Sequence, residues 1–173
     1  MNKEDKRKVI AAFLRTGDVS GLTPEDRETF YVNRCETYGL DPLTRPFEFV
    51  EFKAGKTVFY IRSVATDALA FQHNLTRNTL VDPCVRKYGG IELIYCKVEC
   101  VLPNGRREQA SATLPFNEKT LINDLMKCET KAKRRGTLSI LSLSMMDESE
   151  LESIQSQLAA PMITRELLTS TLD

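Results

Sequence analysis

The sequence predicts an α+β fold, with helices near both ends of the chain and strands between them. Helical periodicity marks residues 5–38 and the region after residue 117. The segments between them are rich in Val, Ile, Phe and Tyr and are separated by turn residues, as strands are. Helices and strands that occupy separate parts of a chain are typical of α+β domains. The length of 173 residues, 42% of them hydrophobic and 28% charged, suits one domain with its own core.

Two helices are predicted at the N-terminal end. The first covers residues 5–15, and the second runs from Pro24 to about Tyr38. Thr23 can cap the second helix, because its hydroxyl can accept a hydrogen bond from an N–H group of the first turn. Pro24 follows at a position where no N–H donor is needed. Gly39 is the expected end of this helix, since glycine adopts the left-handed conformation of helix C-caps without strain.

A hairpin and a helix are predicted next. Asp41-Pro42 begins a turn, since both residues are typical of turns. The strands of the hairpin cover residues 46–52 and 57–61, which are rich in aromatic and β-branched side chains. Ser63 can cap a helix that ends near Asn74.

The second half of the chain predicts another hairpin and then helices. Its expected elements are a strand at 91–102, a strand at 107–114, a helix at 118–146 and a short helix at 147–158. Asn104-Gly105 lies between the two strands and is typical of a tight hairpin turn. Asn117 can cap the long helix. Residues 75–88 are assigned to no helix or strand, and Gly89-Gly90 is expected to form a turn.

Charge is unevenly distributed along the chain, although its 24 basic and 24 acidic residues balance. Residues 147–173 contain one basic and six acidic residues, so residues 1–146 carry a net charge of +5. A basic body with an acidic tail indicates an anionic partner. The alternative is a solvated surface on which the charges are divided at random.

The densest group of basic residues lies within the predicted long helix. The predicted phosphate contacts there are Lys127, Lys131, Lys133, Arg134 and Arg135. Side chains four and seven positions apart share one side of a helix, so such a group can follow a phosphate backbone. The alternative is an ordinary solvated helix face. Because the segment 138–146 is nearly uncharged, these charges are expected at the rim of a packed core.

Other basic residues gather at strand ends and turns. The secondary candidates for phosphate contacts are Arg62, Arg106, Arg107, Lys53 and Lys56. Aromatic residues lie beside some basic ones, as Tyr60 does near Arg62 and Tyr88 beside Lys87. Aromatic rings beside a basic groove hold single-stranded nucleic acid by stacking on its bases. The alternative is that these rings fill the core of a chain that has no tryptophan.

Residues suited to catalysis or metal binding are scarce. The chain has one histidine, His73, and five cysteines without a Cys-x-x-Cys pair, so no metal ion or other cofactor is predicted. The odd number of cysteines indicates free thiols in a reducing compartment. Asp41, Glu51 and Lys53 leave one enzyme alternative open, because metal-dependent nucleases combine two carboxylates with a lysine. Asp41-Pro42 is also a good turn, and the chain is not predicted to be an enzyme.

Three segments follow one another in an order known from one family. Residues 38–45 read Tyr-Gly-Leu-Asp-Pro-Leu-Thr-Arg and precede an aromatic strand. Residues 60–70 are typical of a strand that enters a helix, and in residues 126–154 a basic helix runs into an acidic segment. Together these segments resemble the RecT and Red beta family of phage single-strand annealing proteins over about residues 35–155. The segment 141–144, Leu-Ser-Leu-Ser, departs from the glycines that the family often has there.

The resemblance implies a function, partners and a domain organisation. Such proteins bind single-stranded DNA and anneal it to a complementary strand without ATP. They assemble as homo-oligomeric rings or helical filaments and work with a phage exonuclease. Implied are N-terminal helices (1–40), a β-β-β-α annealing core with a small antiparallel sheet backed by helices (41–146), and an acidic C-terminal helix or tail (147–173). The alternative is an interaction module that binds a nuclease or recombination partner without annealing DNA.

The expected location is the cytoplasm of a bacterial host. The charged segment Met1–Lys6 is not followed by the apolar region of a signal peptide. No apolar run approaches the roughly 20 residues that cross a bilayer, so no membrane contact is predicted.

Overall fold

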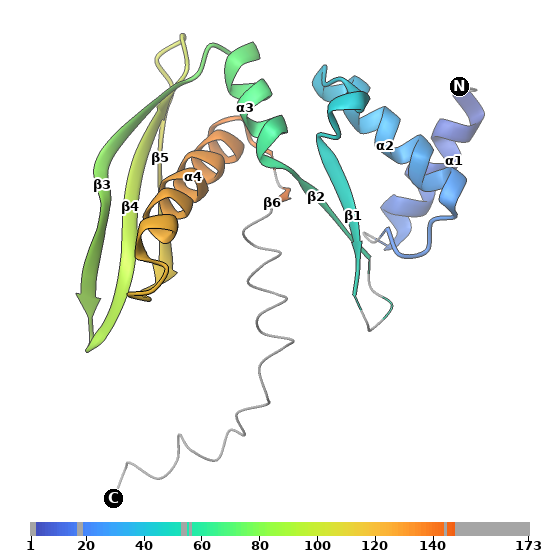
Figure 1. Cartoon of the computed structure of the whole chain (residues 1–173). Helices are drawn as coiled ribbons and strands as arrows, with labels where there is room; N and C mark the ends of the chain where they lie inside the picture. The colour runs from blue at the N-terminus through green and yellow to red at the C-terminus, as the bar shows by residue number, and fades with distance from the viewer. Residues whose placement is uncertain (1–2, 17–18, 53–54, 56, 144, 148–173) are drawn as a thin grey trace, which may run out of the picture.

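The computed structural model describes residues 3–16, 19–52, 55, 57–143 and 145–147, and the predicted α+β class is confirmed (Figure 1). The helices are α1 (Lys3–Thr16), α2 (Pro24–Tyr38), α3 (Ser63–Gln72) and α4 (Leu121–Ile140), with a 3-10 turn at Pro42–Thr44. The strands are β1 (Phe47–Glu51), β2 (Thr57–Ile61), β3 (Thr76–Tyr88), β4 (Ile91–Val101), β5 (Arg107–Pro115) and β6 (Met146–Asp147). They form two sheets, ordered β1-β2-β6 and β3-β4-β5. None of the described helices has the length and apolar character needed to span a membrane.

The ends of α2 lie where the sequence predicts them. Thr23 Oγ1 accepts a hydrogen bond from the backbone N–H of Asp26 at 3.2 Å. Gly39 closes the helix in the left-handed conformation, with a φ of 63°. The carbonyl of Gly39 also accepts a hydrogen bond from Gln72 Nε2 at 2.8 Å, which ties the end of α2 to the end of α3.

The predicted first hairpin is confirmed, since β1 and β2 pair antiparallel along their whole lengths. Its aromatic side chains pack against α2: the rings of Phe30 and Phe59 meet edge to face with centroids 5.0 Å apart. Phe47 stacks on Phe59 at 5.1 Å from the other side of this cluster. Strand β6 pairs in parallel with the end of β2 and completes the sheet.

Strand β3 is missing from the sequence prediction. Asp82 and Pro83 argue against a strand, because aspartate is rare in strands and proline cannot donate a ladder hydrogen bond. The pairing with β4 accommodates them through irregularities between Thr79 and Val81 and between Val81 and Cys84. Proline is tolerated at bulges and on edge strands, and β3 is an edge strand. The predicted turn at Gly89-Gly90 is present, with positive φ at both residues.

Two predicted helix starts are corrected. Asn117 Oδ1 accepts a hydrogen bond from the backbone N–H of Lys119 at 3.0 Å, in a turn that precedes α4. The helix itself begins at Leu121. Ser63 is the first residue of α3 and not its N-cap; Arg62 occupies the N-cap position without a side-chain capping bond.

The predicted end of the long helix is also corrected. Helix α4 ends at Ile140, and Ser142 turns the chain with a positive φ of 57°. Met146 and Asp147 then form β6, so the short helix predicted for 147–158 does not begin at Asp147. The rest of that predicted helix lies outside the described residues.

Helix α4 lies along one face of the β3-β4-β5 sheet and forms a second layer (Figure 1). Alternate residues of β4 are buried against it, namely Ile94, Cys96, Val98 and Cys100. Cys128 and Ala132 of α4 complete this cluster. Farther along α4, Leu138 is buried with Ile61 and Leu69, so the helix also contacts β2 and α3.

We expect one of the five thiols to react with Ellman's reagent in the native protein. Cys84 of β3 is partly exposed, whereas the other four cysteines are buried. Burial raises the pKa of the Cys128 thiol to about 11, which keeps it in the unreactive protonated form near neutral pH. Counting reactive thiols with and without guanidinium chloride should give one in the native protein and all five after unfolding. Rapid reaction of Cys96, Cys100 or Cys128 in the native protein would contradict the packing of α4 on the sheet.

Candidate nucleic-acid interface

Helix α4 carries most of the predicted phosphate contacts, and the sheet fixes its orientation. Cys128, Ala132 and Gly136 follow one another at four-residue spacing and are buried. Gly136 makes the closest approach, since a Cβ atom at this position would lie 2.6 Å from Cys100 Sγ. With this side of α4 held against β4 and β5, its other sides present a fixed set of side chains.

Four of the five predicted contacts on α4 form a row, which we call the basic row: Lys127, Lys131, Arg134 and Arg135. At 3.6 residues per turn these positions lie within about 100° of the helix circumference and span roughly 12 Å of its axis. Lys127 and Arg135 are exposed, and the other two are half-buried. Within the described part of the chain, no carboxylate forms an ion pair with Lys127, Lys131 or Arg135. The row is therefore a positively charged surface of a kind that suits an anionic ligand.

Lys133, the fifth predicted phosphate contact on α4, lies apart from the basic row. It lies about 200° around the helix from Lys131, because the two are two positions apart. Lys133 Nζ lies 2.8 Å from Glu129 Oε1 in an ion pair. The other neighbour of Glu129 is Thr79 of β3, whose hydroxyl donates to Oε1 at 3.3 Å. The hydrogen bond from Lys133 lowers the pKa of Glu129, so this pair stays charged and is oriented toward β3.

The two arginines of the second hairpin point in different directions. Arg106 Nη2 donates to Ser142 Oγ at 3.4 Å, which brings this turn next to the chain that leaves α4. Arg107 begins β5 and forms an ion pair with Glu99 at 3.3 Å. Glu99 lies between the buried residues Val98 and Cys100 of β4, so it projects from the sheet face opposite to α4. Of these two arginines, Arg106 therefore lies on the same side of the sheet as the basic row.

The basic row leads to the junction of α4 with α3 and β2. Leu138 follows Arg134 by four positions and is buried against Ile61. Arg62 comes directly after Ile61, but its guanidinium turns to Glu48, with Nε 3.8 Å from a carboxylate oxygen. Arg62 is thus near the end of the row and already engaged by a carboxylate. The two remaining predicted contacts, Lys53 and Lys56, lie outside the described residues.

A second group of cations and aromatic rings lies on the sheet face turned away from α4, which we call the open face. Its residues are Thr76, Asn78, Val81, Cys84, Arg86 and Tyr88 of β3, Ile91, Leu93, Tyr95, Lys97, Glu99 and Val101 of β4, and Arg107, Gln109, Ser111, Thr113 and Pro115 of β5. The Arg86 guanidinium lies over the Tyr95 ring, 4.2 Å from its centroid. The sequence prediction misses this arrangement because it assigns no strand to residues 75–88. The alternation of Arg86 and Tyr88 is the signal that could have revealed it.

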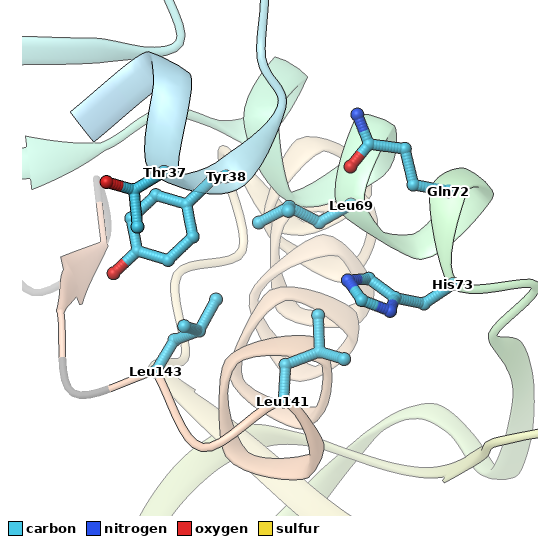
Figure 2. Close-up of a pocket in the computed structure, with 7 residues that line it drawn as sticks. All are labelled: Thr37, Tyr38, Leu69, Gln72, His73, Leu141 and Leu143. Carbon is cyan, nitrogen blue, oxygen red and sulfur yellow. The ribbon is translucent and has the colours of Figure 1, made fainter. Parts of the chain in front are cut away.

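A pocket of about 430 Å³ lies where the ends of α2, α3 and α4 meet (Figure 2). Its lining residues are Thr37, Tyr38, Leu69, Gln72, His73, Leu141 and Leu143. Figure 2 shows Tyr38, Leu69, Leu141 and Leu143 converging on it, with the His73 ring at one side. His73 is the C-cap residue of α3. The pocket is mainly apolar and contains none of the predicted phosphate contacts.

The carboxylates of the nuclease alternative are held in separate interactions. Asp41 Oδ1 accepts a hydrogen bond from the backbone N–H of Leu43 at 2.9 Å and caps the turn. Glu51 lies at the far end of β1 and forms an ion pair with Arg27 at 2.6 Å. Across the described residues, no group of three or more His, Cys, Asp or Glu side chains is placed to hold a metal ion.

A scan against protein-family models finds no matching family, and a search among curated proteins finds no match. The chain's own geometry and the three segments described above therefore carry the functional conclusion. Two features of that geometry matter most: a basic helix fixed on an antiparallel sheet, and an open sheet face with cations and aromatic rings.

Proposed function

We propose that this protein binds single-stranded DNA and anneals complementary strands without ATP. The observation that carries the proposal is the basic row, whose side chains extend from a helix anchored by Cys128, Ala132 and Gly136. A row of this kind contacts phosphates, which are present in every sequence, so binding is independent of base sequence. The resemblance to the RecT and Red beta family supports the same function.

Phosphate contacts alone also account for the annealing step. A strand held by its backbone keeps its base edges available, so a second strand can test them for complementarity. Sequence specificity then comes from base pairing, and the protein supplies position and charge neutralisation. This mechanism needs no cofactor and no covalent step, so we propose no enzymatic activity for the protein.

The assembly, partner and location that we propose follow from the resemblance to the RecT and Red beta family. We propose that copies of the chain assemble as a ring or helical filament on DNA, with a phage exonuclease as partner and the cytoplasm of a bacterial host as location. The proposed annealing core covers residues 41–146, which include the basic row, the β1-β2 hairpin and the β3-β4-β5 sheet. An assembly of this kind would place the basic rows of successive copies along one DNA strand.

An annealing time course tests the proposed function. Two complementary labelled oligonucleotides are mixed without ATP, with and without the protein, at low and moderate salt. We expect faster pairing with the protein at low salt and a smaller effect at moderate salt, because phosphate binding releases counterions. Tight binding of single strands without faster pairing would instead support the interaction module, which binds a nuclease or recombination partner.

A further inference from the structure

The open face is a sheet surface that no described helix covers (Figure 1). Ladder partners share a face of an antiparallel sheet, and the register pairs Tyr95 with Thr113 and Lys97 with Ser111. The intervening residue of β4, Cys96, is fully buried against α4. The side chains of Tyr95 and Lys97 therefore project away from α4, on the other side of the sheet.

The charged groups on this face leave an excess of positive charge. Its cations are Arg86, Lys97 and Arg107, and its carboxylate is Glu99. Arg107 and Glu99 form an ion pair and largely neutralise each other. Asp82 is exposed at the β3 irregularity, near one edge of the sheet. Arg86 and Lys97 remain, on either side of the Tyr95 ring.

The aromatic groups are arranged to receive flat ligands. The Arg86 guanidinium lies over the Tyr95 ring, 4.2 Å from its centroid, and Arg86 is only half-buried. Tyr88 lies two residues farther along the same strand and face, and half of its surface is exposed. Nucleic-acid bases stack on aromatic rings and on guanidinium planes, with similar energies for every base.

We propose that the open face is a second binding surface for single-stranded DNA, on which bases stack against the Arg86–Tyr95 pair and Tyr88. The inference rests on the proposed function, and it adds a surface that the basic row does not include. The exposed residues of β5 on this face, Gln109, Ser111 and Thr113, are polar and favour a hydrated polyanion as the occupant. Val81, Ile91 and Leu93 of the neighbouring strands add apolar contact surface. Because the open face and α4 lie on opposite sides of the sheet, the two surfaces contact different stretches of the DNA strand.

A tryptophan reporter tests this proposal. The chain has no tryptophan, so Tyr88→Trp introduces a single fluorophore on the open face. Oligothymidine of about 20 nucleotides, long enough for several stacked bases, is titrated into the full chain. We expect saturable quenching of the tryptophan fluorescence. Ile10→Trp, on α1, is the matched control, and its fluorescence should stay unchanged over the same titration.

A binding measurement separates this inference from the proposed function. Anisotropy of a labelled oligothymidine reports binding to any surface. Binding without quenching of the Tyr88→Trp variant would overturn the open-face proposal and leave the proposed function standing. Failure of the wild-type chain to bind the oligonucleotide would overturn both. A fluorescence change of Tyr88→Trp that depends on protein concentration, without DNA, would identify a second copy of the chain as the occupant and also overturn the proposal.

Replacing Arg86 and Lys97 of the open face gives an independent test of this proposal. Arg86→Gln with Lys97→Gln removes the stacking plane and the adjacent charge while both side chains stay polar. We expect an affinity for oligothymidine weaker by about fivefold or more, because each stacked base contributes about 1 kcal/mol or more and 1.4 kcal/mol corresponds to about tenfold. Arg107→Gln should cause no comparable change, since Arg107 is already paired with Glu99. Equal affinities of the double variant and the wild type would contradict the proposal.

Discussion

Replacing Gly136 with valine is expected to lower the free energy of unfolding by about 3 kcal/mol. A Cβ atom at this position would lie 2.6 Å from Cys100 Sγ and 3.5 Å from both Ala110 Cβ and Val98 Cγ2. The strand and helix would have to separate, because Cys100 is fully buried and its short side chain has no room to move. Urea denaturation followed by circular dichroism measures the change.

Alanine provides a stricter form of this test. Alanine is a better helix former than glycine by about 1 kcal/mol, so Gly136→Ala would stabilise α4 if space were available. We expect destabilisation instead, and partial recovery when Cys100→Ala removes the sulfur. Gly21→Ala is the control, since nothing lies within 4 Å of the position that its new methyl group would take, and the stability should change little. A Gly136→Ala variant as stable as the wild type would contradict the close packing of α4 on β4.

Removing three cations of the basic row is expected to weaken single-stranded DNA binding by roughly one to two orders of magnitude at low salt. The change is Lys127→Gln with Lys131→Gln and Arg135→Gln, which keeps polar side chains at positions that make no ion pair with the described carboxylates. Each lost phosphate contact should lower the slope of log affinity against log salt by about 0.7 for single strands, so the triple variant should lose about 2. Fluorescence anisotropy over a range of salt concentrations measures both quantities.

Two controls distinguish the basic row from net charge. Arg7→Gln with Lys8→Gln and Lys119→Gln removes the same charge from exposed positions on α1 and before α4. Lys133→Gln removes a cation of α4 that is paired with Glu129. We expect both to bind much more tightly than the triple variant. Equal losses in the charge-matched control would show that binding depends on net charge and not on the row.

The fold could be predicted from the sequence where local signals agree. Thr23, Pro24 and Gly39 define the ends of α2 because each satisfies or replaces a backbone group of the helix terminus. The β3 strand could not be predicted, since Pro83 opposes a strand locally and only its place at a sheet edge makes it acceptable. Long-range pairing overrides the local preference there.

The location of the candidate site on α4 could be predicted from the sequence, but the directions of its side chains could be predicted less well. The charge pattern identifies α4, and helical spacing groups Lys127 with Lys131. Helical spacing also places Glu129 four residues before Lys133, a local signal for this ion pair that the prediction of five phosphate contacts overlooks. The hydrogen bond from Thr79 to Glu129 depends instead on how α4 packs against β3. The direction of Arg107 could not be predicted, since its side of the sheet depends on its register with Val101 of β4.

The measurement that tests the central claim most directly is the annealing rate of the wild-type chain beside that of the triple variant. Both are assayed with the same complementary oligonucleotides, at low salt and without ATP. We predict that the wild type accelerates pairing and that Lys127→Gln with Lys131→Gln and Arg135→Gln removes most of this acceleration. Acceleration that persists in a folded triple variant, or is absent from the wild type, would contradict the proposed function of the basic row.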